Sequence, residues 1–119
     1  MAQDVAIDGF DAVSFFQGAP AQGDAAISHR WNGKDWLFAS AANRDAFAAA
    51  PERYAPQYGG TCAFAVGLGG AAPGKARVFS VVDNKLYFFA AGVPRMLWSF
   101  FPSLIAKGQA NWTRRQHAS

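Results

Sequence analysis

Cys62 is the only cysteine in this 119-residue chain, and it is the residue best suited to soft-metal chemistry. A thiolate binds copper(I) or another soft metal ion at low coordination number, with one or two partners that folding brings close. His29, Met96 and Asp11 are the candidate partners. The close ligand pairs of a structural zinc site, such as Cys-x-x-Cys, do not occur. The competing interpretation is that Cys62, flanked by Thr, Ala and Phe, is a small buried hydrophobe.

Nucleophilic catalysis would pair the Cys62 thiol with a nearby base. His29 is the candidate base, and the Gly59-Gly60 turn could offer backbone N–H groups as an oxyanion hole. However, His29 falls beside Trp36 in an expected hairpin, where a histidine usually belongs to the packing. We therefore predict that the protein is not an enzyme, with a Cys62-based activity as the minor alternative.

Asp8 and Asp11 are the closest pair of carboxylates that could share acid–base work or bind a ligand. Gly9 between them predicts a turn, in which Asp side chains accept hydrogen bonds from nearby backbone N–H groups. We expect this turn role, and we keep both residues as candidates for binding.

The composition excludes several classes of protein. Hydrophobic residues make up 51% of the chain, charged residues 16% and aromatic residues 15%. Disorder requires the opposite balance, and a disulfide scaffold requires more than one cysteine. No apolar run reaches the roughly 18–20 residues of a transmembrane segment. The aromatic residues predict a well-filled core, or an apolar pocket for a small ligand as the alternative.

The charges are distributed unevenly. All eight acidic residues precede residue 84, whereas the rest of the chain carries five Lys and Arg residues and no acid. A basic end can bind nucleic acid or anionic lipid, but five charges over a third of the chain are too sparse to favour either. Nucleic acid is therefore not an expected partner. The sequence leaves the oligomeric state open.

The start of the chain lacks the basic and apolar regions of a signal peptide. As the chain stands, this predicts a cytoplasmic protein, or a periplasmic or exported one if a leader has been removed.

Two hairpins are expected to organise the fold. Asn32-Gly33 between two apolar–polar runs predicts a two-residue turn, which sets the register of the first hairpin. The expected pairs are Trp31 with Lys34, Arg30 with Asp35, His29 with Trp36 and Ile27 with Phe38. Asp83-Asn84 predicts a second turn, with Val81, Leu86, Phe79 and Phe88 on a core face. Beyond the two hairpins the sequence suggests no internal repeat.

Helices are expected after each hairpin. Ser40 is the predicted N-cap of an alanine-rich helix that is anchored by Phe47 and ends at Pro51. Two further helices are divided at Pro102, and their expected inward positions are Trp98, Phe101, Ile105 and Trp112. The predicted fold class is α+β: a small antiparallel sheet built from two β-hairpins with short helices packed against it, in a single domain over residues 1–119.

The same residues resemble the YHS-domain family, above all its small stand-alone and often exported members. The resemblance runs from about residue 5 to 112 through VAIDGFDAVSFF, WNGKDWLFASAANRDAFAAAPERYAPQYGGTCAFAVGLG, VVDNKLYFF and W-x6-I-x6-W. Its most specific part is F-x-S-x-x-N-x-x-x-F-x-x-x-P-x-x-Y-x-P-x-Y-G-G-x-C-A, from Phe38 to Ala63. Asp83-Asn84 departs from the usual Asp-Gly, and Phe89-Ala90-Ala91 departs from a polar stretch.

The resemblance implies a short α+β module of a kind suspected of binding metals, with related copies attached to heavy-metal transport ATPases. Those copies carry cysteines where this chain has Ala39 and Asn43, so the ATPase-type metal site is missing here. The stand-alone group implies a candidate site made of Cys62, Tyr58, Gly59, Gly60, Asp8 and Asp11, to which we add His29. The expected function is a non-catalytic binding protein, with Cys62 holding a soft metal. The alternative is a small-ligand or protein-interaction module with an aromatic pocket and no metal.

Overall fold

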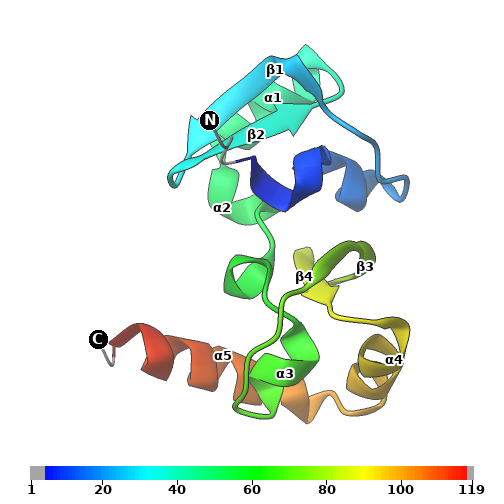
Figure 1. Ribbon diagram of the computed structural model, residues 1–119, viewed down its shortest axis with the longest axis vertical. Helices are drawn as coiled ribbons and strands as arrows, with labels where there is room; N and C mark the ends of the chain where they lie inside the picture. Colours follow the sequence, from blue (N-terminus) through cyan, green and yellow to red (C-terminus); the bar gives the residue numbers. More distant parts are fainter. Residues whose placement is uncertain (1–4, 118–119) are drawn as a thin grey trace. The chain divides into compact units, whose positions relative to one another are not determined.

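The structure is a computed structural model that describes residues 5–117. The chain divides into two compact units (Figure 1). Unit 1 comprises residues 1–55 and 81–86, and unit 2 comprises residues 56–80 and 87–119. The single domain expected from the sequence stays a prediction, because a compact unit is not by itself a domain that folds alone.

Unit 1 contains one β-hairpin with short helices before and after it. Its elements are η1 (Ala6–Gly9), η2 (Ala12–Gln17), β1 (Asp24–Trp31), β2 (Lys34–Phe38), α1 (Ala41–Ala49) and α2 (Pro51–Tyr54). The hydroxyl of Ser40 accepts a hydrogen bond from the N–H of Asn43 at 3.1 Å, which confirms Ser40 as the cap of α1. Pro51 begins the next helix at a position where proline loses no hydrogen bond.

The register of the first hairpin is as predicted near its turn and differs at the far end. Trp31, Arg30 and His29 pair with Lys34, Asp35 and Trp36 as expected. Phe38, however, pairs with Asp24 rather than Ile27, because the register shifts between Asp24 and Ser28. An irregularity of this kind inserts unpaired residues into one strand, which a turn-based register cannot anticipate.

The second half of the chain has its own hairpin and helices. Its elements are η3 (Gln57–Gly60), α3 (Ala63–Gly67), β3 (Lys75–Val82), β4 (Lys85–Phe89), α4 (Gly92–Phe100) and α5 (Ser103–His117). The α+β class and both antiparallel hairpins are confirmed, with each hairpin forming a two-stranded sheet of its own. No helix within the described residues combines the length and apolar content of a membrane span.

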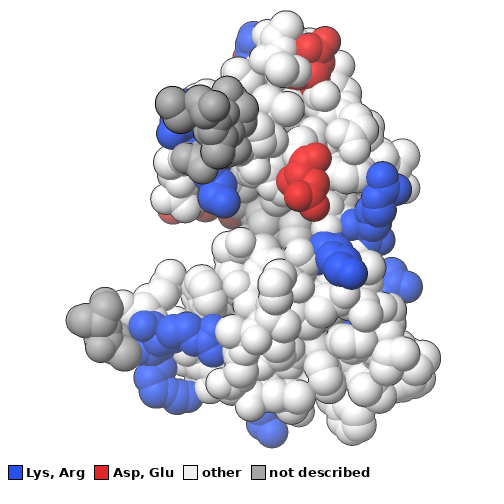
Figure 2. Space-filling view, in the orientation of Figure 1, with Lys and Arg blue, Asp and Glu red and all other residues white. Residues whose placement is uncertain are grey.

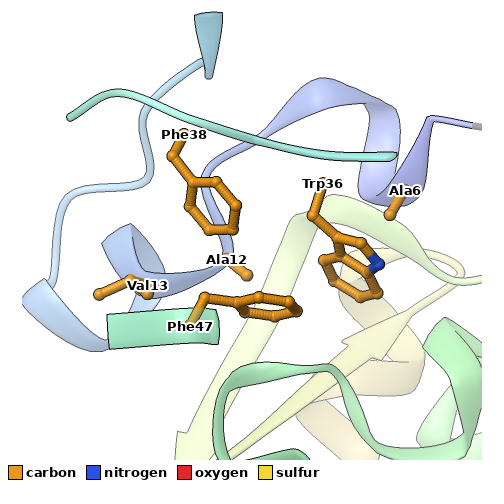
Figure 3. Close-up of a cluster of buried hydrophobic side chains, with 6 residues drawn as sticks. All are labelled: Ala6, Ala12, Val13, Trp36, Phe38 and Phe47. Atoms are coloured by element: carbon orange, nitrogen blue, oxygen red, sulfur yellow. The ribbon is translucent and has the colours of Figure 1, made fainter. Parts of the chain in front are cut away.

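The core of unit 1 is centred on Phe47 (Figure 3), which is fully buried as predicted. Figure 3 shows its ring turned toward Phe38 and Trp36, at centroid distances of 5.2 and 4.8 Å. Ala6, Ala12 and Val13 complete the buried cluster. Helix α1 is thus attached to the hairpin mainly through one aromatic side chain.

The second hairpin corrects two expectations about the core. In β4 the four residues from Leu86 to Phe89 are all buried, so that strand is covered on both faces rather than one. Val81, expected on the core face, is 38% exposed. Trp98 of α4 packs on Tyr87 and Phe89 at centroid distances of 4.9 and 5.1 Å. Because residues on both faces of β4 are buried, its burial does not follow a two-residue period.

Residues 6–55 and 57–106 are built on the same plan, so the chain is a tandem structural repeat. Elements η1, β1, β2 and α1 begin at residues 6, 24, 34 and 41, and their counterparts η3, β3, β4 and α4 begin at 57, 75, 85 and 92. The offset is 51 residues in every case, and each pair of elements has the same length. We call these segments the first and second repeats.

Individual backbone hydrogen bonds recur at the same offset. In the first repeat the N–H of Gly23 donates a hydrogen bond to the carbonyl oxygen of Gly9 at 2.8 Å. In the second repeat the N–H of Gly74 donates to the carbonyl oxygen of Gly60 at 3.1 Å. The N–H groups of Asp11 and Cys62 donate to Ala21 and Ala72 in the same way, each at 2.8 Å. The repetition therefore includes the loops as well as the helices and strands.

The repeat is hard to see in the sequence because only about a quarter of the paired positions are identical. Three of the identical pairs are glycines, and in each pair the backbone conformation or a close backbone contact requires glycine. Gly9 and Gly60 have φ of 81° and 87°, and Gly18 and Gly69 have φ of 81° and 89°, values that favour glycine. Gly23 and Gly74 lie so close to neighbouring backbone that neither leaves room for a Cβ. The spacing of these glycines is the sequence signal that could have revealed the repeat.

Candidate functional site

Asp11 is fully buried, and its carboxylate organises the first repeat. Oδ1 accepts hydrogen bonds from the N–H groups of Val13 and Ser14, at 2.9 and 3.2 Å. Oδ2 accepts from the N–H of Ala39 at 2.9 Å and from the amide of Asn43 at 2.8 Å. These four donors connect three segments of unit 1. The carboxylate is therefore engaged in holding the fold.

Asp8, the other carboxylate of the predicted pair, is exposed. It lies in a left-handed turn in which Ile7, Asp8 and Gly9 have φ of 45°, 56° and 81°. The turn expected from Gly9 is present, and it separates the two carboxylates into a surface group and a buried one. No shared acid–base geometry results.

His29 is half-buried on β1, where its ring packs edge-on against Phe47 at a centroid distance of 6.1 Å. This is the packing role that a histidine beside Trp36 was expected to have. His29, Asp8 and Asp11 belong to unit 1, whereas Cys62 and the Tyr58–Gly60 turn belong to unit 2. The candidate residues thus form two sets, one in each unit.

The Tyr58-Gly59-Gly60 turn is the counterpart of Ile7-Asp8-Gly9 and has the same left-handed backbone, with φ of 60°, 61° and 87°. Positive φ is uncommon for a tyrosine, so its surroundings must hold it. The Tyr58 ring is buried between Tyr87 and Trp112, at centroid distances of 6.0 and 5.8 Å. The turn therefore places an aromatic anchor in the core of unit 2.

The Tyr58 hydroxyl is buried without a hydrogen-bond partner within residues 5–117. It faces α5 at Gly108, where an added Cβ would lie 2.7 Å from the hydroxyl oxygen. Burial raises the pKa of Tyr58 to about 12, with a further contribution from Tyr87 nearby. An ionised tyrosine is thus strongly disfavoured here, and Tyr58 is not suited to proton transfer near neutral pH.

Cys62 is 2% exposed at the start of α3. Its backbone N–H donates to Ala72 and its backbone oxygen accepts from Val66. Cys62 occupies the position in the second repeat that Asp11 occupies in the first. Asn43 of the first repeat corresponds to Pro94 in the second, which offers no amide donor. A small apolar thiol at this position therefore suits its surroundings better than a carboxylate would.

Cys62 is a buried free cysteine, and a soft-metal site with one or two partners at its thiol stays a prediction. No group of three or more His, Cys, Asp or Glu side chains able to hold a metal ion occurs among the described residues. Ala39 and Asn43 meet at the carboxylate of Asp11 as hydrogen-bond donors. Those positions thus contribute donors to Asp11 and no soft ligand.

An open depression of about 340 Å³ in unit 2 is lined by Gly69, Asn111, Arg114 and Arg115. Arg115 donates to the carbonyl oxygen of Gly70 at 2.8 Å, and Arg114 donates to Asn111 at 2.7 Å. The lining is basic, unlike the aromatic pocket that the sequence suggested. Both guanidinium groups already bind neighbouring oxygens, which accounts for their placement.

The most unusual surface of the second repeat is one that sequence reasoning missed. Val93, Met96 and Phe100 lie three and four residues apart on α4 and are 61%, 52% and 71% exposed. We call these three residues the α4 face. Phe101, which was expected to pack inward, is 55% exposed and extends the apolar surface beyond the helix end. Side chains of this size and exposure are uncommon in such a group on a small protein.

Helix α1 provides an internal comparison for the α4 face. The counterparts of Val93, Met96 and Phe100 are Ala42, Asp45 and Ala49, which are also exposed. The inward counterparts, Phe47 and Trp98, are both buried aromatics. Both helices therefore keep an inner aromatic, whereas their outer positions take small or charged residues in α1 and large apolar residues in α4. The signal available in the sequence was the apolar i, i+3, i+7 spacing of Val93, Met96 and Phe100, of which only Met96 had been singled out, as a candidate metal partner.

Comparisons with known proteins returned no relative. No protein-family model matches the chain, and no curated protein and no solved structure matches it. The YHS resemblance accordingly rests on the quoted sequence motifs.

Proposed function

We propose that this chain is a non-catalytic binding module of the YHS type that acts through the α4 face. The observation that carries the proposal is the contrast between the two repeats. Three equivalent helix positions carry small or charged side chains in α1 and large apolar side chains in α4, although they are exposed in both helices. Exposed apolar groups that the fold does not require are typical of interaction surfaces.

The residues that carry the YHS resemblance stabilise the fold, which is consistent with a binding surface elsewhere on the protein. Asp11 binds four donors, Ser40 caps α1, and Cys62 is buried at the position equivalent to Asp11. Tyr58 anchors the core of unit 2. The motif thus accounts for the architecture, while the binding surface lies outside its most specific part.

A binding role is also favoured over catalysis by the state of the candidate chemical groups. The Cys62 thiol is buried and the Asp11 carboxylate is already hydrogen-bonded. A nucleophile or general base must reach its substrate, which neither group does here. We do not extend the proposal to a soft metal at Cys62, because the thiol is buried and no group of three or more His, Cys, Asp or Glu side chains that could hold a metal occurs among the described residues.

Exchange of the α4 face for its α1 counterpart tests the proposal. The triple variant Val93→Ala, Met96→Asp, Phe100→Ala should keep the melting temperature and circular dichroism of the wild type. It should also lose most of the binding of anilinonaphthalene sulfonate, a dye that reports accessible apolar surface. A large drop in melting temperature would contradict the proposal, because the face would then serve the fold.

The reverse exchange in α1 is the matched control. Ala42→Val, Asp45→Met, Ala49→Phe installs the same side chains at the same positions of the other repeat. This variant should gain dye binding. If the α1 variant does not gain dye binding, the dye does not report apolar side chains exposed at these helix positions. The loss of dye binding in the triple variant would then have another cause.

A further inference from the structure

We infer that the α4 face docks on an anionic lipid surface. Its apolar side chains would enter the boundary between headgroups and acyl chains, and the basic residues of unit 2 would face the lipid phosphates. The inference rests on the proposed function, since it names the partner of the same surface. Three observations lead to it: the shape of the face, the charge of unit 2 and the unsuitability of other partners.

The α4 face projects from the protein. Val93, Met96 and Phe100 are each more than half exposed, and Leu68 and Phe101, also in unit 2, are 64% and 55% exposed. On the inner side of α4, Trp98 is 4% exposed and holds the helix to β4. A helix attached on one side with protruding Phe, Met and Val on the other is the arrangement of an interfacial membrane helix.

The charge of unit 2 is complementary to an anionic surface. Its residues include six Lys and Arg and no acid, a net charge of +6, whereas unit 1 carries all eight acids and five bases, a net charge of −3. On the face shown in Figure 2, the surface over α5 carries blue and no red, and the surface over α4 is white. Basic residues around an apolar area attract the protein to anionic lipid and hold it there.

The sequence alone did not favour this partner, because five bases spread over the last third of the chain looked too sparse. Folding changes the grouping of charges: Lys75 and Arg77 of β3 join unit 2, Lys85 falls in unit 1, and every acid also falls in unit 1, so that unit 2 holds six bases and no acid. It also places an exposed apolar helix face in that basic unit. The combination of charge and apolar contact is what a lipid surface requires.

Other partners fit this surface less well. A second copy docked face to face would bring two units of charge +6 together without an acid in either to neutralise them. Nucleic acid would use the basic residues but would leave Phe100 and Met96 without a role.

Flotation with lipid vesicles is the experiment. The full chain is incubated with vesicles of phosphatidylcholine containing about 30% phosphatidylglycerol, and with vesicles of pure phosphatidylcholine. We expect the protein to float with the anionic vesicles and to do so less at 0.5 M than at 0.1 M salt, because salt screens the attraction. The triple variant Val93→Ala, Met96→Asp, Phe100→Ala should bind at least tenfold more weakly.

Two tryptophan variants show whether the face enters the lipid. Phe100→Trp places the reporter on the α4 face, and Ala49→Trp places it at the same position of α1. With anionic vesicles, the emission of the first should shift to shorter wavelength and be quenched by brominated acyl chains relative to the same variant without vesicles. The second should show neither change, and the native tryptophans common to both variants provide the background.

The outcomes separate this inference from the proposed function. Absence of anionic vesicle binding, with the dye difference between wild type and triple variant intact, overturns lipid as the partner and leaves the binding module standing. Equal binding to neutral and anionic vesicles also overturns the inference, since charge would have no part. A dimer that the triple variant abolishes, without vesicle binding, would assign the face to a second copy. A triple variant that fails to fold removes the proposed function itself, whereas Phe100→Trp still tests insertion.

Discussion

The carboxylate of Asp11 accepts a hydrogen bond from the side-chain amide of Asn43, 32 residues later in the chain, at 2.8 Å. The same oxygen accepts from the N–H of Ala39 at 2.9 Å. This contact joins the N-terminal turn to the start of α1.

Replacement of Asp11 by Asn should therefore destabilise the protein strongly. One carboxylate oxygen becomes an NH₂ group that faces N–H donors, and these buried donors lose their acceptor. We expect a loss of about 2–5 kcal/mol in the free energy of unfolding, measured by urea denaturation. Asp35→Asn is the control, because its ion pair with Arg30 (3.1 Å) is on the surface and should contribute less than about 1 kcal/mol. Equal losses in the free energy of unfolding for the two substitutions would show that the Asp11 hydrogen bonds stabilise the protein no more than a surface ion pair does.

Gly108 and Tyr58 should be energetically coupled. A Cβ at Gly108 would lie 2.7 Å from the Tyr58 hydroxyl oxygen and 3.2 Å from the ring carbon that carries it. Gly108→Ala should cost about 1–3 kcal/mol through overpacking. In the Tyr58→Phe background the same substitution should be nearly neutral or stabilising, since the closest atom is gone and Ala favours a helix by about 1 kcal/mol. Additive effects in a double-mutant cycle would contradict the close approach.

Stability at alkaline pH should depend on Tyr58. Below pH 10 both the folded and the unfolded states keep the phenol proton. Above it the unfolded state loses its proton while the folded state, with a pKa of about 12, retains it. The free energy of unfolding should fall between pH 10 and 12, by about 2–3 kcal/mol in total. Tyr58→Phe should lack this part of the decline, and identical pH profiles would show that the hydroxyl is not buried in solution.

The Cys62 thiol should be protected in the folded protein. At 2% exposure it should react with a disulfide reagent only as the chain unfolds, so that the rate follows unfolding rather than reagent concentration. A titration with copper(I) against a chromophoric chelator should show no competition that Cys62→Ala removes. Rapid labelling, or a stoichiometric site lost in Cys62→Ala, would restore the soft-metal interpretation.

Gly23 and Gly74 should be the least replaceable glycines of the two repeats. A Cβ at Gly23 would overlap the backbone of Leu37, and one at Gly74 would overlap the carbonyl of Gly60. Backbone cannot move aside as a flexible side chain can, so each change to Ala should cost about 1–3 kcal/mol or more. Gly92→Ala, where a Cβ meets nothing within 4 Å, should be neutral or slightly stabilising and serves as the control in thermal unfolding.

The sequence by itself determined the local elements of this protein. Asn32-Gly33 set the turn and the nearby register of the first hairpin, Ser40 and Pro51 bounded α1, and Phe47 was its anchor. These features depend on a few adjacent residues, because turn type, capping and helical spacing are local properties. Even so, the register shift between Asp24 and Ser28 lay beyond local rules, since it arises where Gly23 packs against Leu37.

Tertiary structure alone decided which residues were available for function. It buried Asp11 and Cys62 at equivalent positions of two repeats that share few side chains, and it turned Phe100 and Phe101 outward. From its apolar spacing, α4 could turn either of two faces toward the core. In the structure it turns Trp98 inward, where the indole packs on Tyr87 and Phe89 of β4. Burial is a property of the assembled chain, so a sequence pattern can name the apolar residues but not say which of them the core accepts.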